Sequence, residues 1–441
     1  MTASVTRTPP SADGHSPEPP RTGAPTARRG VGGRGRTGGL RLNRRAGPVG
    51  SFRLQQLVLL EIAAALLLCA WVVDPVLLTP AGVVAATLVV LAVARRHRRS
   101  LPEWLRTVLA LRARTRRAAS TVPPADTEPG IAPAVECEPA LRTQVFSERD
   151  RRPVGMIGDG TYLTAVLRVE ADGTALRADR SARPLPLALV RDALEIDGIR
   201  LESAQIVQHT RPAPAPHLPQ QSVAVRNYAP LQAQTGAPAV RITWIALKLD
   251  PELCPQAVRA RGGGLTGAQK CLVRTAGQLA GRLTGAGFRT TVLTEQELGP
   301  AIATSVCADP PAPPPAGGSG APARRTRETS RSWECDGRHH TVYWVSRWPQ
   351  PGGGAPMPRL VALLTSVPAL ATTFSLTLGQ GEGQEVTLTG HIRITGRDSG
   401  ELLTARQELE RTARGVRTSL VRLDREQLPG VLATLPLGGT R

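Results

Sequence analysis

Two uninterrupted apolar segments near the start of the chain dominate its hydrophobic pattern. Residues 54–73 and 76–94 are rich in leucine, valine and alanine, and only Asp74 and Pro75 separate them. Twenty helical residues extend about 30 Å, the thickness of the hydrocarbon core of a bilayer. Proline cannot continue a helix, because it lacks the amide hydrogen. The pattern predicts a two-helix transmembrane hairpin within residues 51–95. The length and pairing of the segments disfavour soluble core helices and a cleaved signal peptide.

Arginines flank this hairpin on both outer sides, whereas its turn carries only Asp74. The flanking residues are Arg41, Arg44, Arg45, Arg53, Arg95, Arg96, Arg98 and Arg99. Positively charged flanks remain on the cytoplasmic side of a membrane. We therefore expect a two-pass protein of the plasma membrane, with both termini and the main body in the cytoplasm.

Glu61 is the one charged residue within the first apolar segment. A charged side chain near the middle of a bilayer costs about 2.5–3.5 kcal/mol on insertion scales. Glu61 should therefore either face a protein partner or be neutral. We predict a candidate intramembrane contact between Glu61 and another subunit, and a tolerated, protonated residue is the alternative.

The segments on either side of the hairpin have different compositions. Residues 1–50 are rich in proline, glycine and arginine, which predicts a disordered basic tail. Residues 96–133 contain a capping box at Ser100 and Glu103, and then an apolar stripe surrounded by arginines. The stripe consists of Leu101, Trp104, Leu105, Val108 and Leu109. It predicts an amphipathic helix lying in the membrane interface, with packing on the cytosolic body as an equal alternative. A proline-rich linker at residues 121–133 follows.

Strand and helix patterns recur beyond residue 134, which indicates an α/β cytosolic body. Strands are expected at residues 161–170, 199–208, 239–250 and from 288, with helices at 186–196, 266–284 and from 295. We expect an α/β domain at residues 134–309, a proline- and glycine-rich loop or linker at 310–330, and a C-terminal α/β part at 331–441. The pattern leaves open whether the two parts form one sheet.

The charge of the chain is strongly positive, with 55 basic and 35 acidic residues and a net charge of +20. Much of the excess lies in the first 120 residues, beside the predicted hairpin, and only 3% of residues are aromatic. Anionic lipid head groups therefore explain the charge better than nucleic acid does. The six cysteines form no CxxC pair, which disfavours a disulfide framework and an ordinary zinc site.

Motifs for catalysis or ligand binding are incomplete. The segment GGGLTGAQK, residues 262–270, resembles a phosphate-binding loop, but Lys270 comes late and no serine or threonine follows it. Cys335, His339 and His340 have no second ligand pair at a spacing that suits zinc. We therefore expect no enzyme activity, no cofactor, and no catalytic, cofactor-binding or metal-binding residues.

Several strings of the chain resemble the EccE family of type VII secretion proteins in its streptomycete form. They are IRLESAQIVQHTRPAPAPHLP, SVAVRNYAPLQ, RITWIALKLDPELCPQAVRARGGGLTGAQKCLVR, LAGRLTGAGFRTTVLTE and RETSRSWECDGRHHTVYWVSRWP, and with the hairpin they span residues 50–350. The resemblance implies a structural subunit of an inner-membrane secretion complex. It also implies EccB, EccC and EccD as partners, with EccC as the motor ATPase and EccD as the expected direct contact. The family has no assigned catalytic residues.

Two classes of function are therefore compared. The first is a non-catalytic scaffold within the secretion complex, which the resemblance favours. The second is a stand-alone membrane-anchored enzyme with an unrecognised site, such as a transferase that acts on lipids at the cytosolic face. Co-purification distinguishes them, because a scaffold is extracted together with its partners in a fixed ratio.

Overall fold

The structure is a computed structural model, and it describes residues 40–42, 54–74, 76, 78–93, 95–96, 99–120, 127–148, 152–171, 184–212, 219, 221–223, 225–227, 230, 240–310, 324–349, 356–381 and 385–439. All described residues belong to one compact unit, Gly39–Arg441. The predicted basic tail lies outside the described residues except for β1 (Leu40–Leu42). Residues 121–126 of the predicted linker and 311–323 of the predicted loop also lie outside them.

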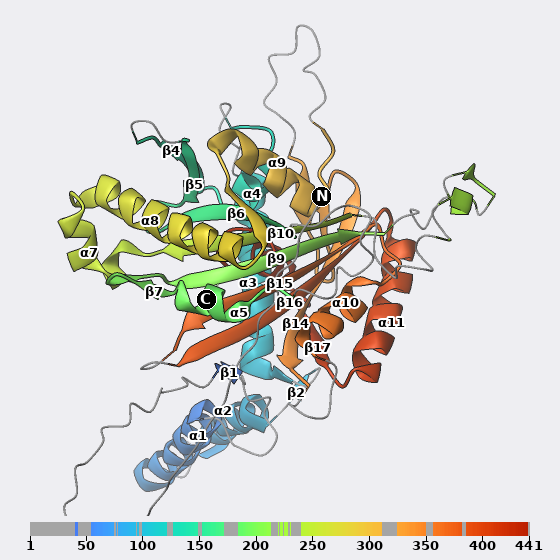
Figure 1. Cartoon of the computed structure of the whole chain (residues 1–441). Coiled ribbons are helices and arrows are strands. Elements are labelled where there is room, and N and C mark those ends of the chain that lie inside the picture. The colour runs from blue at the N-terminus through green and yellow to red at the C-terminus, as the bar shows by residue number, and fades with distance from the viewer. Residues whose placement is uncertain are drawn as a thin grey trace, which may run out of the picture. The chain divides into compact units, whose positions relative to one another are not determined.

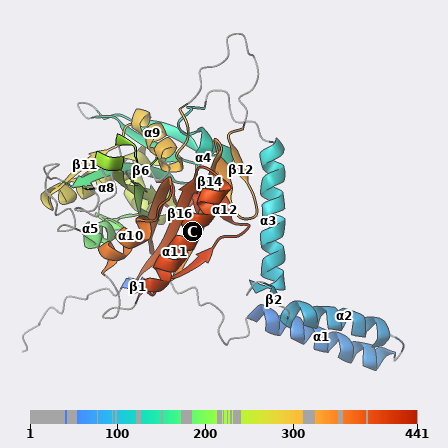
Figure 2. The same ribbon diagram turned by 90° about the vertical axis from the view of Figure 1, so that its right-hand side faces the viewer.

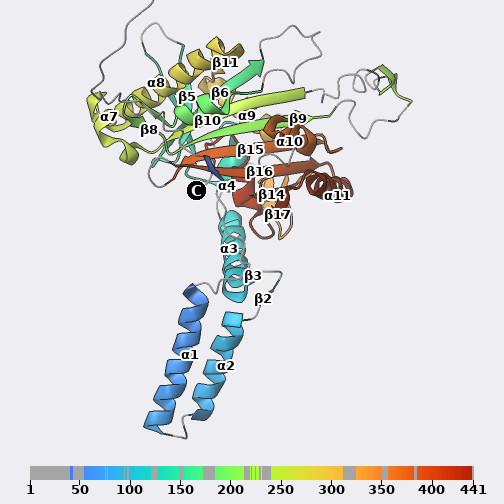
Figure 3. The ribbon, with the colours of Figure 1, turned by 60° about the horizontal axis from the view of Figure 1, so that its bottom comes forward.

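Two helices, α1 (Leu54–Val73) and α2 (Leu78–Val93), occupy the two apolar segments and pack against each other (Figure 3). Small residues such as Ala63 and Ala85 are buried in them, whereas Leu68 and Trp71 are exposed. Considering the described residues alone, no helix has both the length and the apolar character needed to cross a membrane. The two-pass topology stays a prediction.

Among the described residues, thirteen strands form one large sheet, in which β1 from the N-terminal segment joins strands from both parts of the body (Figure 1). The main path runs in the order β12 (Thr326–Glu328), β13 (Trp333–Cys335), β14 (Arg338–Arg347), β16 (Val386–Gly396), β15 (Ala371–Gln380), β9 (Ser203–Arg211), β10 (Val240–Leu249), β6 (Leu163–Ala171), β5 (Val154–Gly158) and β4 (Arg142–Phe146). Beside this path, β11 (Phe288–Val292) pairs with β6, β17 (Ser419–Arg422) with β14, and β1 with β16.

Neighbouring strands of the main path are antiparallel, and only β1 pairs in parallel. The pairing of β9 with β15 joins the residues before position 310 to those after position 330. The prediction of a mixed α/β body is confirmed. The question left open by the hydrophobic pattern is answered, since strands from both parts belong to a single sheet.

Helices cover both faces of the sheet. One face packs against α5 (Leu187–Asp192), α7 (Pro255–Ala260), α8 (Gly264–Gly285), α10 (Met357–Thr365) and α11 (Ser399–Gly415). The other face packs against α4 (Ala132–Cys137), α9 (Glu295–Val306) and α12 (Gln427–Leu432). Side chains alternate between the two faces of a strand, so Ile392 and Ile394 join the first core while Arg393 points to the α9 side.

Local sequence signals explain where individual elements begin and turn. A capping box starts α9, because Glu297 accepts hydrogen bonds from the backbone amide of Thr294 at 2.8 Å and from its hydroxyl at 3.0 Å. Positive φ angles at Asp197 and Gly198 form the turn between β7 (Glu195–Ile196) and β8 (Ile199–Arg200). Two further short strands, β2 (Arg95–Arg96) and β3 (Arg99–Ser100), connect α2 to the next helix.

Candidate functional site

The helix after the hairpin, α3 (Leu101–Ser120), has one partly buried face and one exposed face. The partly buried positions recur every three or four residues, at Trp104, Thr107, Val108, Leu111, Arg114 and Ala118. Leu105 and Leu109 lie on the exposed face, with 47% and 53% of their surface accessible. The predicted apolar stripe is therefore divided between two faces of the helix.

An ion pair fixes the buried face of α3 to the body. Two nitrogens of Arg114 donate to the two carboxylate oxygens of Glu328 on β12, at 2.8 and 2.9 Å. Arg114 also donates to the carbonyl oxygen of Arg425, at 2.7 Å. Glu328 is only 3% exposed and accepts a further hydrogen bond from the amide of Leu428 in α12. One buried carboxylate thus connects α3, β12 and the start of α12. Figure 2 shows α3 next to the part of the body that contains β12 and α12.

Two further arginines hold the same helix. The guanidinium of Arg425 lies 5.5 Å from the centre of the Trp104 ring, a distance that suits a cation–π interaction. Arg324 donates to the carbonyl oxygens of Ala118 in α3, at 3.0 Å, and Glu136 in α4, at 2.7 Å. We call these contacts of Trp104, Arg114 and Ala118 with the body the α3 junction. They favour the alternative in which α3 packs on the α/β body.

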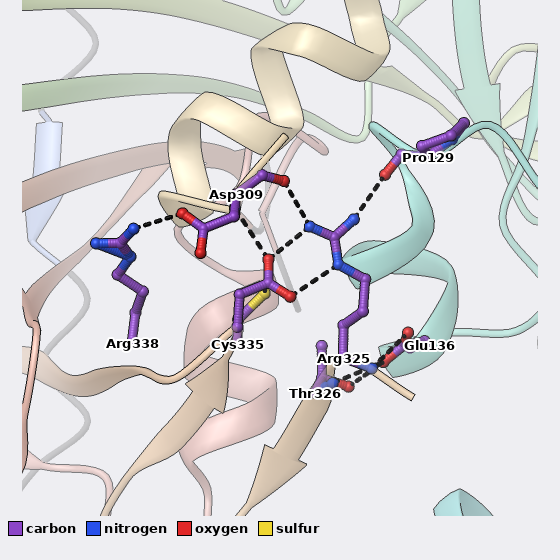
Figure 4. A network of polar contacts seen from close by, with 8 residues as sticks. Pro129, Glu136, Asp309, Arg325, Thr326, Cys335 and Arg338 are labelled. Atoms are coloured by element: carbon purple, nitrogen blue, oxygen red, sulfur yellow. Dashed lines mark hydrogen bonds and ion pairs between the residues drawn. The ribbon is translucent and has the colours of Figure 1, made fainter. Parts of the chain in front are cut away.

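A second polar network lies next to the junction (Figure 4). Glu136 is buried and accepts hydrogen bonds from the amides of Arg325 and Thr326 and from the Thr326 hydroxyl. Arg325 donates to both carboxylate oxygens of Asp336, at 2.8 and 2.5 Å, and to the carbonyl oxygen of Asp309. These bonds position the chain on both sides of residues 311–323.

The electrostatics of this network favour the ionised carboxylate of Asp336. Burial by itself would raise the pKa of Asp336. Hydrogen bonds from the Arg325 side chain and the Asp309 amide outweigh burial, so the pKa of Asp336 lies below its ordinary value. The network therefore holds a full ion pair at neutral pH and serves as a rigid connection between α4, α9 and β13.

The residues singled out from the sequence lie elsewhere. Glu61 is exposed on α1 and makes none of the contacts of the α3 junction. Lys270 is exposed on α8, and the three glycines at the start of that helix, Gly262, Gly263 and Gly264, all have positive φ angles. His340 is buried and its Nδ1 lies 3.0 Å from the Thr395 hydroxyl, whereas His339 lies 3.5 Å from Glu334. In the part of the chain that the structure describes, no group of three or more His, Cys, Asp or Glu side chains could hold a metal ion.

A comparison with protein families identifies the segment that carries part of this junction. Residues 237–345 match the family described as "Putative type VII ESX secretion system translocon, EccE". This segment is similar to the EccE family. The match runs from β10 into β14 and includes Glu328 and Arg324, so the resemblance to EccE read from the sequence is confirmed. No curated protein matches the chain significantly.

Sequence reasoning missed the α3 junction, although a signal for it exists. Arg114 falls at helical spacing with Trp104 and Leu111, on the face opposite to Leu105 and Leu109. An arginine that shares a helix face with Trp104 and Leu111 is expected to have a buried partner. The partner itself, Glu328, lies more than two hundred positions away, and no local pattern indicates it.

Loss of the ion pair between Arg114 and Glu328 is expected to lower the stability of the chain, whereas loss of an exposed arginine of α3 is not. Replacing Arg114 by alanine is expected to lower the free energy of unfolding by about 1–3 kcal/mol, because Glu328 would remain buried without its cation. This range is below that of a fully buried pair, since the Arg114 side chain is 21% exposed. Arg116→Ala, on the exposed face of the same helix, is the matched control and should change the free energy by less than about 0.5 kcal/mol. Urea denaturation of the full chain in detergent measures both, and equal effects would contradict the junction.

Proposed function

We propose that the chain is a non-catalytic structural subunit of the inner-membrane complex of a type VII secretion system. The observation that carries this proposal is the similarity of residues 237–345 to the EccE family. The site adjoining that segment supports it, because the α3 junction consists of ion pairs and hydrogen bonds that fix a helix in place. Such contacts hold α3 in a fixed position on the body, which suits a subunit with a structural role in a complex.

We further propose that residues 54–73 and 76–94 anchor this subunit as a two-pass hairpin whose ends are both cytoplasmic. The helices α1 and α2 occupy these segments, and several of their large apolar side chains are exposed, including Leu68, Trp71 and Val72. Exposed apolar surface on a helix pair requires a cover of lipid or protein. The arginines on the outer flanks set the orientation.

In this arrangement the two faces of α3 contact different surroundings. Its partly buried face binds the body through the α3 junction, and its exposed face presents Leu105 and Leu109 among arginines such as Arg112 and Arg116. Apolar residues surrounded by arginines suit the boundary between anionic head groups and acyl chains. Anionic lipids are therefore the proposed partner of this exposed face.

The proposed protein partners are EccB, EccC and EccD, with EccD in direct contact. Extraction of the full chain from its own membranes in mild detergent is the test. The other components are expected to co-purify in a fixed ratio, because a structural subunit is held by several interfaces. Recovery of the chain alone, as a single monodisperse species, would overturn the proposed function.

Glu61 is the proposed point of contact between the hairpin and a neighbouring subunit. It is exposed on α1, so its carboxyl group is available to a partner. Glu61→Leu is expected to weaken co-purification by roughly 3- to 20-fold, since interhelical hydrogen bonds in membranes contribute about 0.6–1.7 kcal/mol. Glu61→Gln keeps a hydrogen-bonding side chain and is the matched control. Undiminished co-purification of Glu61→Leu would show that the contact lies elsewhere.

A further inference from the structure

A row of polar side chains is buried between the sheet and α9. Arg393 on β16 lies opposite Thr373 on β15, and Thr373 in turn lies opposite His209 on β9. On the other side of Arg393, His340 on β14 pairs with Thr395, two residues further along β16. All five residues are 0% exposed. The row therefore crosses four neighbouring strands on the face that α9 covers (Figure 1).

Hydrogen bonds within the row leave several nitrogens without a partner. Nη2 of Arg393 donates to the carbonyl oxygen and the hydroxyl of Ser305, at the end of α9, and to the hydroxyl of Thr373 at 3.4 Å. Thr373 Oγ1 also lies 3.0 Å from Nδ1 of His209. Among the described residues, Nε and Nη1 of Arg393 and Nε2 of both His209 and His340 have no hydrogen-bond partner.

The donors of the row come mainly from Arg393. Its Nε and Nη1 carry hydrogens and have no partner among the described residues. His209 adds a donor at Nε2 in the tautomer in which the Thr373 hydroxyl donates to Nδ1. All of these side chains are closed to solvent.

The row also carries a positive charge that no carboxylate among the described residues cancels. Burial lowers the pKa of Arg393 to about 10, which still leaves the guanidinium protonated at neutral pH. No Asp or Glu within the described residues forms an ion pair with it. Burial raises the pKa of the nearby Cys335 thiol far above neutrality, so that thiol cannot serve as a counter-ion. A buried, unpaired guanidinium would cost several kcal/mol.

We propose that Arg393, together with His209, forms a binding site for a small monovalent anion of the halide class. A halide accepts several hydrogen bonds and cancels one charge, which matches the donors and the charge of the row. Water could accept the same hydrogen bonds, but it would leave the charge of Arg393 uncompensated. The enclosure of the row by the sheet and α9 selects a small ion over phosphate or a nucleotide.

Binding of the anion would stabilise the packing of α9 on the sheet. Arg393 already donates to the last turn of α9 through Ser305, and the anion would fix the guanidinium in that position. The same helix precedes Asp309, whose carbonyl oxygen accepts from Arg325 beside the α3 junction. Anion binding would therefore stabilise the part of the body to which α3 is attached.

Halide-dependent stability of the full chain in detergent tests this site. Sodium gluconate is replaced stepwise by sodium bromide at constant ionic strength, and the folding equilibrium constant is measured by urea denaturation. It is expected to rise about tenfold for each tenfold increase in bromide above the dissociation constant. Arg393→Met removes the charge but keeps the length, and should abolish this dependence. Arg411→Met, on the exposed surface of α11, is the matched control and should keep it.

A second measurement covers the case in which Arg393→Met does not fold. Bromide-81 NMR of the unmodified chain should show line broadening that chloride reverses. Equal stability of the unmodified chain in bromide and gluconate would overturn the site and leave water as the occupant. Equal bromide dependence of the unmodified chain and Arg393→Met would also overturn it, because the effect would then be a general one of the salt.

Discussion

Removal of residues 434–441 is expected to unfold the α/β body. This segment follows α12, and its Leu435 and Leu437 are 1% and 6% exposed within the core on the α9 side of the sheet. Each fully buried leucine contributes about 1.5–3 kcal/mol relative to an exposed one. The end of the chain is therefore part of the core rather than an extension of it.

Hydrogen bonds to the same segment increase the expected loss. The Ser203 hydroxyl donates to the carbonyl oxygen of Gly438 at 2.6 Å, and the Gly438 amide donates to Gln205 Oε1 at 2.8 Å. The Thr164 hydroxyl donates to the carbonyl oxygen of Leu437 at 3.1 Å. Each buried group that loses its partner costs about 1–3 kcal/mol. Together with the leucines, the loss is at least about 6 kcal/mol, which is comparable to the stability of a typical domain.

Thermal unfolding followed by circular dichroism measures this effect. The chain without residues 434–441 is expected to lose its cooperative transition, whereas removal of residues 440–441 alone takes away none of these contacts and is the matched control. Leu437→Ala should give an intermediate loss of about 2–5 kcal/mol. A cooperative transition at an unchanged temperature in the shortened chain would contradict the prediction.

The elements that the sequence predicted best are those with a long, regular pattern. The helix expected at residues 266–284 is α8 (Gly264–Gly285), and the strand expected at residues 239–250 is β10 (Val240–Leu249). The spacing of apolar residues in each of these two segments reflects the burial of one side of the element. This spacing can be recognised from neighbouring residues alone. The prediction was less accurate for the helix expected at 186–196, which ends at Asp192 because the chain turns at Asp197 and Gly198.

The pairing of strands that are distant in the sequence could not be predicted from such patterns. β9 and β15 are separated by about 160 positions, and alternation identifies a strand without identifying its neighbour. The apolar segment LVALLTSV, which begins after residue 359, lies largely within helix α10. A short apolar run does not indicate by itself whether it forms a helix or a strand. The order of the sheet therefore follows from contacts that only the folded chain makes.

Buried charges are the least predictable part of the candidate site. Glu136, Glu328 and Arg393 have residue types that are usually exposed, and their sequence neighbours do not distinguish them. Each is buried because a distant segment supplies hydrogen bonds, as Arg114 does for Glu328. Glu61 differs, since an apolar segment surrounds it and marks it directly; its proposed contact stays a prediction.

Acidification from pH 6.5 to pH 5 is expected to destabilise the body by about 3 kcal/mol in halide-free buffer. Burial and the charges of Arg393 and Arg211 lower the pKa of His209 to about 3. Burial, with Arg393, His339, Arg338 and His209 nearby, lowers the pKa of His340 well below its ordinary value. Both histidines therefore stay neutral in the folded chain throughout this range.

The sign follows from the protons bound by each state. Below about pH 6.5 an unfolded histidine takes up a proton, whereas folded His209 and His340 do not. The unfolded state then binds more protons, so the free energy of unfolding falls as the pH falls. Each histidine contributes a slope that approaches about 1.4 kcal/mol per pH unit. For His209 the loss continues until the pH nears 3, where its folded form also becomes protonated.

Urea denaturation between pH 7 and pH 5 isolates this contribution, because ordinary carboxyl groups titrate below that range. Replacement of His209 by glutamine should halve the slope with pH, even if it also lowers stability at pH 7, since only one buried imidazole then remains to exclude a proton. His339→Gln, on the same strand as His340 but partly exposed, should keep the steep dependence because both buried histidines are still present. A slope that His209→Gln leaves unchanged would mean that His209 binds its proton in the folded chain. The cationic row around Arg393 would then already hold an anion or be open to water.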